Sequence, residues 1–282
     1  MDTVPQLFIE SVCLCLLDLP SLWESTSIPS AWGQICTVTT KKIHTLRVVL
    51  DGSAEKIYVA ALPALDNDVY YNYVSLNCVD LKFITNFRIE TVPHDQVQVL
   101  SNSWNEITLD KLQRFVQFIR PVKNERHPLR YHDESLNSLS LWCESQWING
   151  EILSMRLPVD SVDLWKVEAD QFFENTGSLY YVNYYGPTLK RSAVRQWLSE
   201  EQMKKLFEKC AEANREVRVR VTTISDSTDP IDYDKYYSER KVLEHGTEVL
   251  FTNQDKKKLE LRLFHSNRLW LEWKWSKERI FS

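Results

Sequence analysis

Glycine is scarce in this chain. The 282 residues contain six glycines, and each of them is isolated from the others. They are Gly33, Gly52, Gly150, Gly177, Gly186 and Gly246. Loops that cradle phosphate groups, and the sharp turns that expose a nucleophilic serine, need clustered glycines. The sequence therefore argues against a nucleotide-binding loop and against a hydrolase with a glycine-rich nucleophile turn.

Paired cysteine motifs and long apolar runs are also missing. None of the six cysteines forms a C-x-x-C pair, which disfavours a zinc site built from neighbouring thiolates. The beginning of the chain carries Asp2 and Glu10 in place of a basic region, and the apolar run at 12–17 is too short for a secretory signal. No run approaches the roughly 18 apolar residues of a membrane span. We therefore expect no membrane association, and a reducing compartment, the cytoplasm or the nucleus.

Positive charge is not in excess. The formal net charge is −5 and the calculated isoelectric point is about 5.8. A mildly acidic surface is a poor match for the phosphate backbone of nucleic acids. The lysine run at 256–258 is expected to be a solvated turn. The composition thus predicts no nucleic-acid partner.

The beginning of the chain predicts short amphipathic helices. Pro5 suits a first helical turn, where its missing N–H costs nothing. Leu7 or Phe8, followed by Val12 and Leu16, then recur about every four residues and form one apolar stripe. We expect this helix to end near Asp18–Leu19–Pro20. A second helix is expected to begin at Pro29, with Ser27 as its cap, so that residues 1–40 form two or three short helices.

The rest of the chain alternates between strand and helix patterns. Strand pairs are predicted around Asp51–Gly52 and around Asn149–Gly150, two pairs of residues that favour tight hairpin turns. Helices are predicted over 108–119, 165–175 and 199–213. Further strands are predicted over 87–89, 97–99, 178–185 and 216–223, followed by three closing strands. The fold class is therefore α+β, with short N-terminal helices followed by a largely antiparallel sheet and a few covering helices. We place a domain boundary between residues 1–40 and 41–282.

The tryptophans of the last predicted strand fall on opposite faces. Trp273 and Trp275 share one face with Leu271 and are expected in the core. Trp270 lies on the other face and is the candidate surface aromatic.

No group of residues predicts catalysis. His127, His132, Asp133 and Glu134 are chemically suitable as metal ligands or general bases, but their spacing matches no helical ligand motif. The acidic run at 226–234 lacks the glycine and the terminal glutamate of a calcium loop. Polar loops are the favoured interpretation of both segments. We therefore expect no enzymatic activity of the chain itself, no metal and no cofactor.

The first forty residues combine three features: Val4–Pro5 near the start, a later Trp32, and apolar residues between them. The apolar residues are Phe8, Ile9, Val12, Leu16 and Leu22. This pattern resembles an F-box, the helical element by which substrate receptors bind a Skp adaptor protein. Val4–Pro5 stands at the position of its Leu-Pro, and Trp32 near its tryptophan. The opening residues are similar to those of the lineage-expanded nematode F-box-like proteins that carry a divergent F-box-associated domain.

This resemblance implies an adaptor role. Residues 1–40 would bind the Skp protein of a Skp–cullin–F-box ubiquitin ligase, through the partner-binding residues Pro5, Phe8, Ile9, Val12, Leu16 and Trp32. Residues 41–282 would recognise an unknown protein substrate. The resemblance also implies that catalysis belongs to partner enzymes and that the chain needs no cofactor.

Two other functions stay open at this point. In the first, the chain is a stand-alone protein-binding module whose N-terminal helix is an integral part of its core. In the second, it is an enzyme of unrecognised type that uses the loop at 127–134.

Overall fold

The computed structural model describes most of the chain and divides it into two compact units. The described residues are 4–16, 18–64, 72–119, 137–169, 172–173, 179, 181–185, 200–214, 216–222, 231–243, 248–255, 258–266 and 270–276. The first unit comprises Met1–Ile148 with Leu157–Val159, and the second comprises Asn149–Arg156 with Asp160–Ser282.

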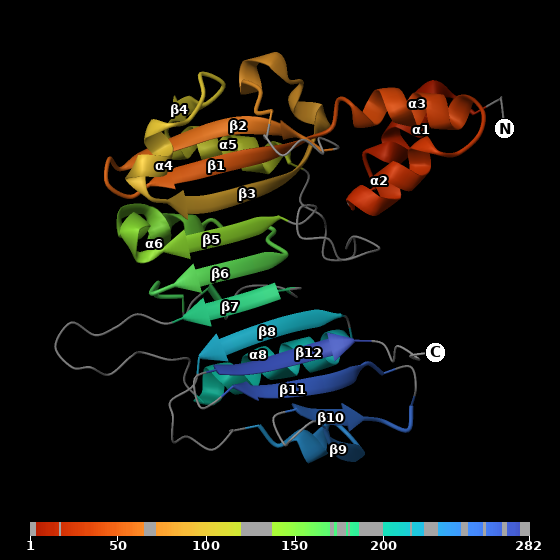
Figure 1. Cartoon of the computed structure of the whole chain (residues 1–282), viewed down its shortest axis with the longest axis vertical. Helices are drawn as coiled ribbons and strands as arrows, with labels where there is room; N and C mark the ends of the chain where they lie inside the picture. Colours follow the sequence, from red (N-terminus) through yellow and green to blue (C-terminus); the bar gives the residue numbers. More distant parts are fainter. Residues whose placement is uncertain are drawn as a thin grey trace. The chain divides into compact units, whose positions relative to one another are not determined.

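Three helices open the first unit and form what we call the N-terminal module, residues 4–40. They are α1 (Gln6–Cys13), α2 (Leu19–Thr26) and α3 (Ala31–Thr40), and both α1 and α2 pack against α3. Figure 1 shows the module beyond the ends of strands β1 and β2. The prediction of two or three short helices in this region is confirmed.

The helix boundaries differ from those predicted. Helix α1 ends at Cys13, and the segment at 18–20 begins α2 where we expected the end of α1. The Asp18 side chain accepts a hydrogen bond from the Ser21 N–H at 2.8 Å, and Pro20 fits the first turn of α2. Helix α3 begins after Ser30, whose φ of 89° breaks the helical path, and Ser27 does not cap it. Leu16 therefore follows α1 instead of extending its apolar stripe.

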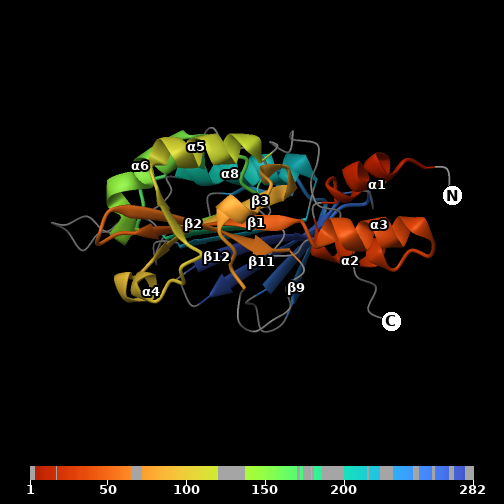
Figure 2. The same ribbon diagram turned by 90° about the horizontal axis from the view of Figure 1, so that it is seen from above.

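The sheet of the first unit has five described strands in the order β4-β2-β1-β3-β5. Their bounds are β1 (His44–Asp51), β2 (Lys56–Pro63), β3 (Ile84–Val92), β4 (Asn105–Ile107) and β5 (Ser138–Trp142). Helix α5 (Leu109–Phe118) covers one face, while α4 (His94–Gln98) lies on the opposite side (Figure 2). Thr108 caps α5 by accepting a hydrogen bond from the Lys111 N–H, and the helix predicted over 108–119 is confirmed.

The sheet of the second unit has seven described strands in the order β6-β7-β8-β12-β11-β10-β9. Their bounds are β6 (Ser161–Trp165), β7 (Tyr181–Tyr185), β8 (Val217–Thr222), β9 (Glu239–Leu243), β10 (Glu248–Thr252), β11 (Glu260–Ser266) and β12 (Trp270–Ser276). Helix α8 (Glu200–Ala213) covers one face of this sheet (Figure 2). The helix predicted over 199–213 and the three closing strands are confirmed.

An aromatic core lies between α8 and the second sheet. Phe207 of α8 contacts both Trp273 and Trp275, with ring centroids 5.4 Å apart in each case. Each buried indole N–H donates a 2.8 Å hydrogen bond to a tyrosine hydroxyl, Trp273 to Tyr233 and Trp275 to Tyr237. The predicted burial of both tryptophans is confirmed. Apolar burial and satisfied polar atoms therefore reinforce each other here.

The fold is mixed α/β, and the predicted arrangement is only partly right. Covering helices follow the N-terminal module, as predicted, but parallel strand pairs occur in both units: β1–β3 and β3–β5 in the first, β6–β7 and β7–β8 in the second. Parallel neighbours need a long crossover connection, usually a helix. Helix α5 lies in the connection from β3 to β5, and α8 in the connection from β7 to β8. These helices are therefore crossovers.

Three local predictions are wrong. Asn149–Gly150 lies inside helix α6 (Gln146–Ser154), because the buried Ile148 and Ile152 repeat with helical spacing and no strand follows β5 there. Residues 97–99 belong to α4 and its end, where we expected a strand. Residue 165 ends strand β6, where we expected a helix to begin. Residues 172–173 are helical, and the rest of that predicted helix after 169 lies outside the described residues.

Candidate protein-docking site

Large apolar side chains are exposed on all three helices of the N-terminal module. Leu7 and Phe8 of α1 are 75% and 54% exposed, and Trp23 of α2 and Val38 of α3 are 51% and 55% exposed. Ile28, in the turn between α2 and α3, is also exposed. More than half of the exposed large apolar side chains in the described part of the chain belong to this module. Exposed apolar side chains concentrated in one small element are typical of a protein-interaction surface.

The helical periodicity of α1 explains why Leu7 and Phe8 face outward. Ile9 and Cys13 are four residues apart and therefore share one side of the helix. Both are buried and pack with Cys36 of α3 in a small core cluster. Once this side of α1 faces α3, the side chains at positions 7 and 8 must point elsewhere. The exposure of Leu7 and Phe8 is thus a direct result of how α1 packs.

Four of the predicted partner-binding residues retain access to solvent. Phe8 is exposed, and so is Pro5, which precedes α1 as its N-cap residue. Val12 in α1 and Leu16 after it are half-buried. These four positions can contact a partner without any change in the module.

The other two predicted partner-binding residues contribute to the module's own packing. Ile9 is 2% exposed, and Trp32 is partly buried against the same core cluster. Ile9 therefore packs α1 against α3, and Trp32 of α3 packs against the same cluster. Leu7 was expected as the alternative to Phe8 in the apolar stripe, whereas Trp23 and Val38 were not among the predicted partner-binding residues. Asp18 and Pro20 are typical of a helix start and could have predicted that Trp23 lies on a helix.

The module is continuous with the first sheet. Thr39, Thr40 and Ile43 are buried where α3 runs into β1. A salt bridge joins Glu10 of α1 to Lys82, with 3.7 Å between the charged atoms, and the lysine side chain is largely exposed. Ion pairs of this kind contribute little free energy. The buried path from α3 into β1 therefore attaches the module more firmly than this charge pair does.

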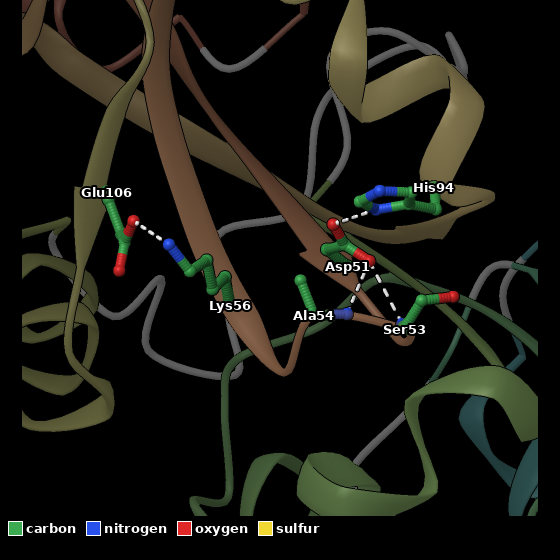
Figure 3. Close-up of polar contacts among 6 residues, drawn as sticks. All are labelled: Asp51, Ser53, Ala54, Lys56, His94 and Glu106. Carbon is green, nitrogen blue, oxygen red and sulfur yellow. Dashed lines mark hydrogen bonds and ion pairs between the residues drawn. The ribbon is translucent and has the colours of Figure 1, made fainter.

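A cluster of polar side chains lies at the β1–β2 turn, within the described residues of the first unit. The buried carboxylate of Asp51 accepts hydrogen bonds from the Ser53 and Ala54 N–H groups at 2.9 and 3.0 Å (Figure 3). Its other oxygen lies 2.7 Å from Nδ1 of His94, at the start of α4. Burial by itself raises the pKa of Asp51, but these hydrogen bonds and the nearby imidazole outweigh it, and the pKa is lowered. The cluster fixes the turn and joins it to α4.

Arginines and a tryptophan line the face of the second sheet opposite α8. The buried carboxylate of Glu272 on β12 accepts hydrogen bonds from Arg218 and Arg220 on β8, at 2.7 to 3.2 Å. The guanidinium of Arg220 lies 4.6 Å from the ring centroid of Trp270. Trp270 is half-buried on the face opposite Trp273, as predicted. Arginine side chains that are fixed by hydrogen bonds and lie beside a partly exposed aromatic ring are suited to contact a protein surface.

The described residues contain no metal-binding group of three or more His, Cys, Asp or Glu side chains. The candidate loop at 127–134 lies outside the described residues, as do Asp226 and Asp229 of the acidic run. The helices in the described part of the chain are too short or too polar to cross a membrane.

Comparisons with other proteins identify no relatives. No protein-family model matches the chain, and neither a curated protein nor a solved structure matches it.

Proposed function

We propose that this protein is a non-enzymatic adaptor that binds another protein through its N-terminal module, with the Skp protein of a cullin ubiquitin ligase as that partner. The exposed side chains of Leu7, Phe8 and Trp23 carry the proposal, together with the F-box-like residue pattern around them. In this role the sheet units present a recognition surface to a protein substrate, and the adaptor works in the cytoplasm or nucleus.

The energetic basis is the burial of apolar surface. Each square ångström of apolar surface removed from water contributes about 25 cal/mol, and a few anchors dominate most interfaces. Leu7 and Phe8 are consecutive residues of α1, and their exposed side chains are available as such anchors. A short helix that offers apolar anchors to a groove is a common mode of protein recognition. The Arg218–Glu272–Arg220 face with Trp270 is the part of the second unit that we assign to substrate recognition.

The test measures binding of the full-length chain to purified Skp adaptor by isothermal titration calorimetry. We expect the double variant Leu7→Asp, Phe8→Asp to weaken binding at least about tenfold, because two charges replace apolar anchors. The variant should keep its far-ultraviolet circular dichroism and melting temperature, since both side chains are already exposed.

Val99→Asp is the matched control. Val99 is 81% exposed and follows α4, outside the N-terminal module, so this substitution adds surface charge without touching α1. It should leave the affinity unchanged. The absence of wild-type binding at tens of micromolar, or equal losses in both variants, would contradict the adaptor proposal.

A further inference from the structure

Two buried cysteines meet inside the N-terminal module. Cys13 is the last residue of α1, and Cys36 lies within α3. Neither side chain is accessible to solvent, and the two sulfur atoms are 2.9 Å apart. We propose that Cys13 and Cys36 form a redox-active thiol pair, which peroxide converts to a reversible disulfide that locks α1 onto α3.

The geometry requires little movement. A disulfide bond is about 2.0 Å long, so the sulfurs need to approach by roughly another 0.9 Å. Both side chains already point toward each other within one core cluster, which also includes Ile9. The bond would join two helices that otherwise meet through few buried side chains. This separates the pair from Cys210, whose buried side chain has no cysteine beside it among the described contacts.

The reduced pair is protected until α1 opens. Burial raises the pKa of the Cys13 thiol to about 12, and the hydrogen bond and charge of Cys36 add to the effect. Since the thiolate is the reactive form, the closed module reacts slowly. Helix α1 has eight residues and no side-chain hydrogen bond at its N-cap, and short helices of this kind open at low cost. Opening of α1 brings Cys13 to solvent.

The oxidation proceeds in two balanced steps. One cysteine sulfur attacks an oxygen of hydrogen peroxide, the O–O bond breaks, and a sulfenic acid and one water form. The second sulfur then displaces the sulfenic oxygen, so that the S–S bond forms and a second water leaves. The two sulfurs supply two electrons, which reduce peroxide to water, and both thiol protons end in water. A thiol reductant reverses the change by thiol–disulfide exchange.

The test exposes the folded, full-length Cys15→Ser variant to hydrogen peroxide, alkylates the remaining thiols after denaturation and cleaves the chain after glutamate. Cleavage after Glu24 separates residues 11–24, in which Cys13 is then the only cysteine, from residues 25–55, in which Cys36 is the only one. We expect these two peptides to be recovered as one disulfide-linked species, and dithiothreitol to release both. Amide exchange in α1 should be about ten- to a hundredfold slower after oxidation.

The wild-type chain is treated in parallel, and Cys36→Ala and Cys210→Ala serve as controls. Cys36→Ala should abolish both the linked peptide and the slower exchange, whereas Cys210→Ala should change neither. Recovery of Cys13 and Cys36 as alkylated thiols while the exposed Cys78 is oxidised would overturn the proposal. Linkage of Cys13 to any cysteine other than Cys36 would overturn it as well. The readouts involve no partner protein, so this inference and the proposed function can fail independently.

Discussion

The N-terminal module and the aromatic core under α8 treat large apolar side chains in opposite ways. Under α8, Phe207, Trp273 and Trp275 are fully covered, and their polar atoms have partners. In the module, α1 packs against α3 through a small buried cluster of Ile9, Cys13 and Cys36 with three partly buried neighbours, and Leu7 and Phe8 are exposed to solvent. The exposed side chains of the module are therefore not needed for the packing of the described residues, whereas the buried aromatic side chains under α8 are needed for it.

The largest effect should come from the aromatic core. Replacing Trp273 by Ala removes the centre of the contacts with Phe207 and leaves the hydroxyl of Tyr233 without its donor. Large-to-small changes of this kind cost about 3–5 kcal/mol. Urea denaturation should show this decrease in the free energy of unfolding.

Trp270→Ala is the matched control, because Trp270 lies on the same strand with its side chain on the opposite face. We expect this variant to lose about 1 kcal/mol at most, from its contact with Arg220. Equal losses in the two variants would remove the distinction between covered and accessible aromatic residues on β12.

The helices and strands with a strongly periodic apolar pattern were predicted correctly. The helix predicted over 199–213 and the strand predicted over 216–223 appear in the structure as α8 (Glu200–Ala213) and β8 (Val217–Thr222). Asn149–Gly150 misled because its turn preference is weak beside Ile148 and Ile152, which bury with helical spacing. The parallel direction of some strands could not be predicted from local sequence patterns. It depends on the path of the connections through α5 and α8, which place β5 parallel to β3 and β8 parallel to β7.

The local structure around the candidate site could be predicted from the sequence only in part. Short helices were expected within residues 1–40, where α1, α2 and α3 lie, and Phe8, expected at an accessible apolar position, is exposed. Helix α1 ends at Cys13, several residues before the predicted end. Leu16 therefore lies outside the helix and does not belong to its apolar stripe. Ile9 and Phe8 are adjacent and equally apolar, so only the packing against Cys36 decides which of them is buried.

A smaller and more local effect is expected within the module. Ile9→Ala empties much of the cluster that holds α1 on α3, which should cost about 2 kcal/mol, the low end for such a change because few neighbours surround the site. Amide hydrogen exchange should show faster opening of α1, while the amides of β8 and β12 keep their protection. Equal acceleration in α1 and β12 would indicate that the module unfolds only together with the second sheet.

The smallest effect, and the one that depends on pH, concerns the turn held by Asp51. The lowered pKa of this carboxyl stabilises the folded state at pH values above the unfolded pKa of about 3.9, and the contribution is lost as the pH falls through the still lower folded value. Asp51→Asn removes the charge that the Ser53 and Ala54 N–H groups and His94 stabilise, and should cost about 1 kcal/mol at pH 7. Urea denaturation at pH 7 and near pH 2 should show that the difference in free energy of unfolding between wild type and Asp51→Asn is smaller in acid.

The buried cluster of Ile9, Cys13 and Cys36 contains no carboxylate, so the effect of Ile9→Ala on the free energy of unfolding should be nearly the same at both pH values. A difference for Asp51→Asn that stayed constant with pH would mean that the turn depends on the shape of this side chain and not on its charge.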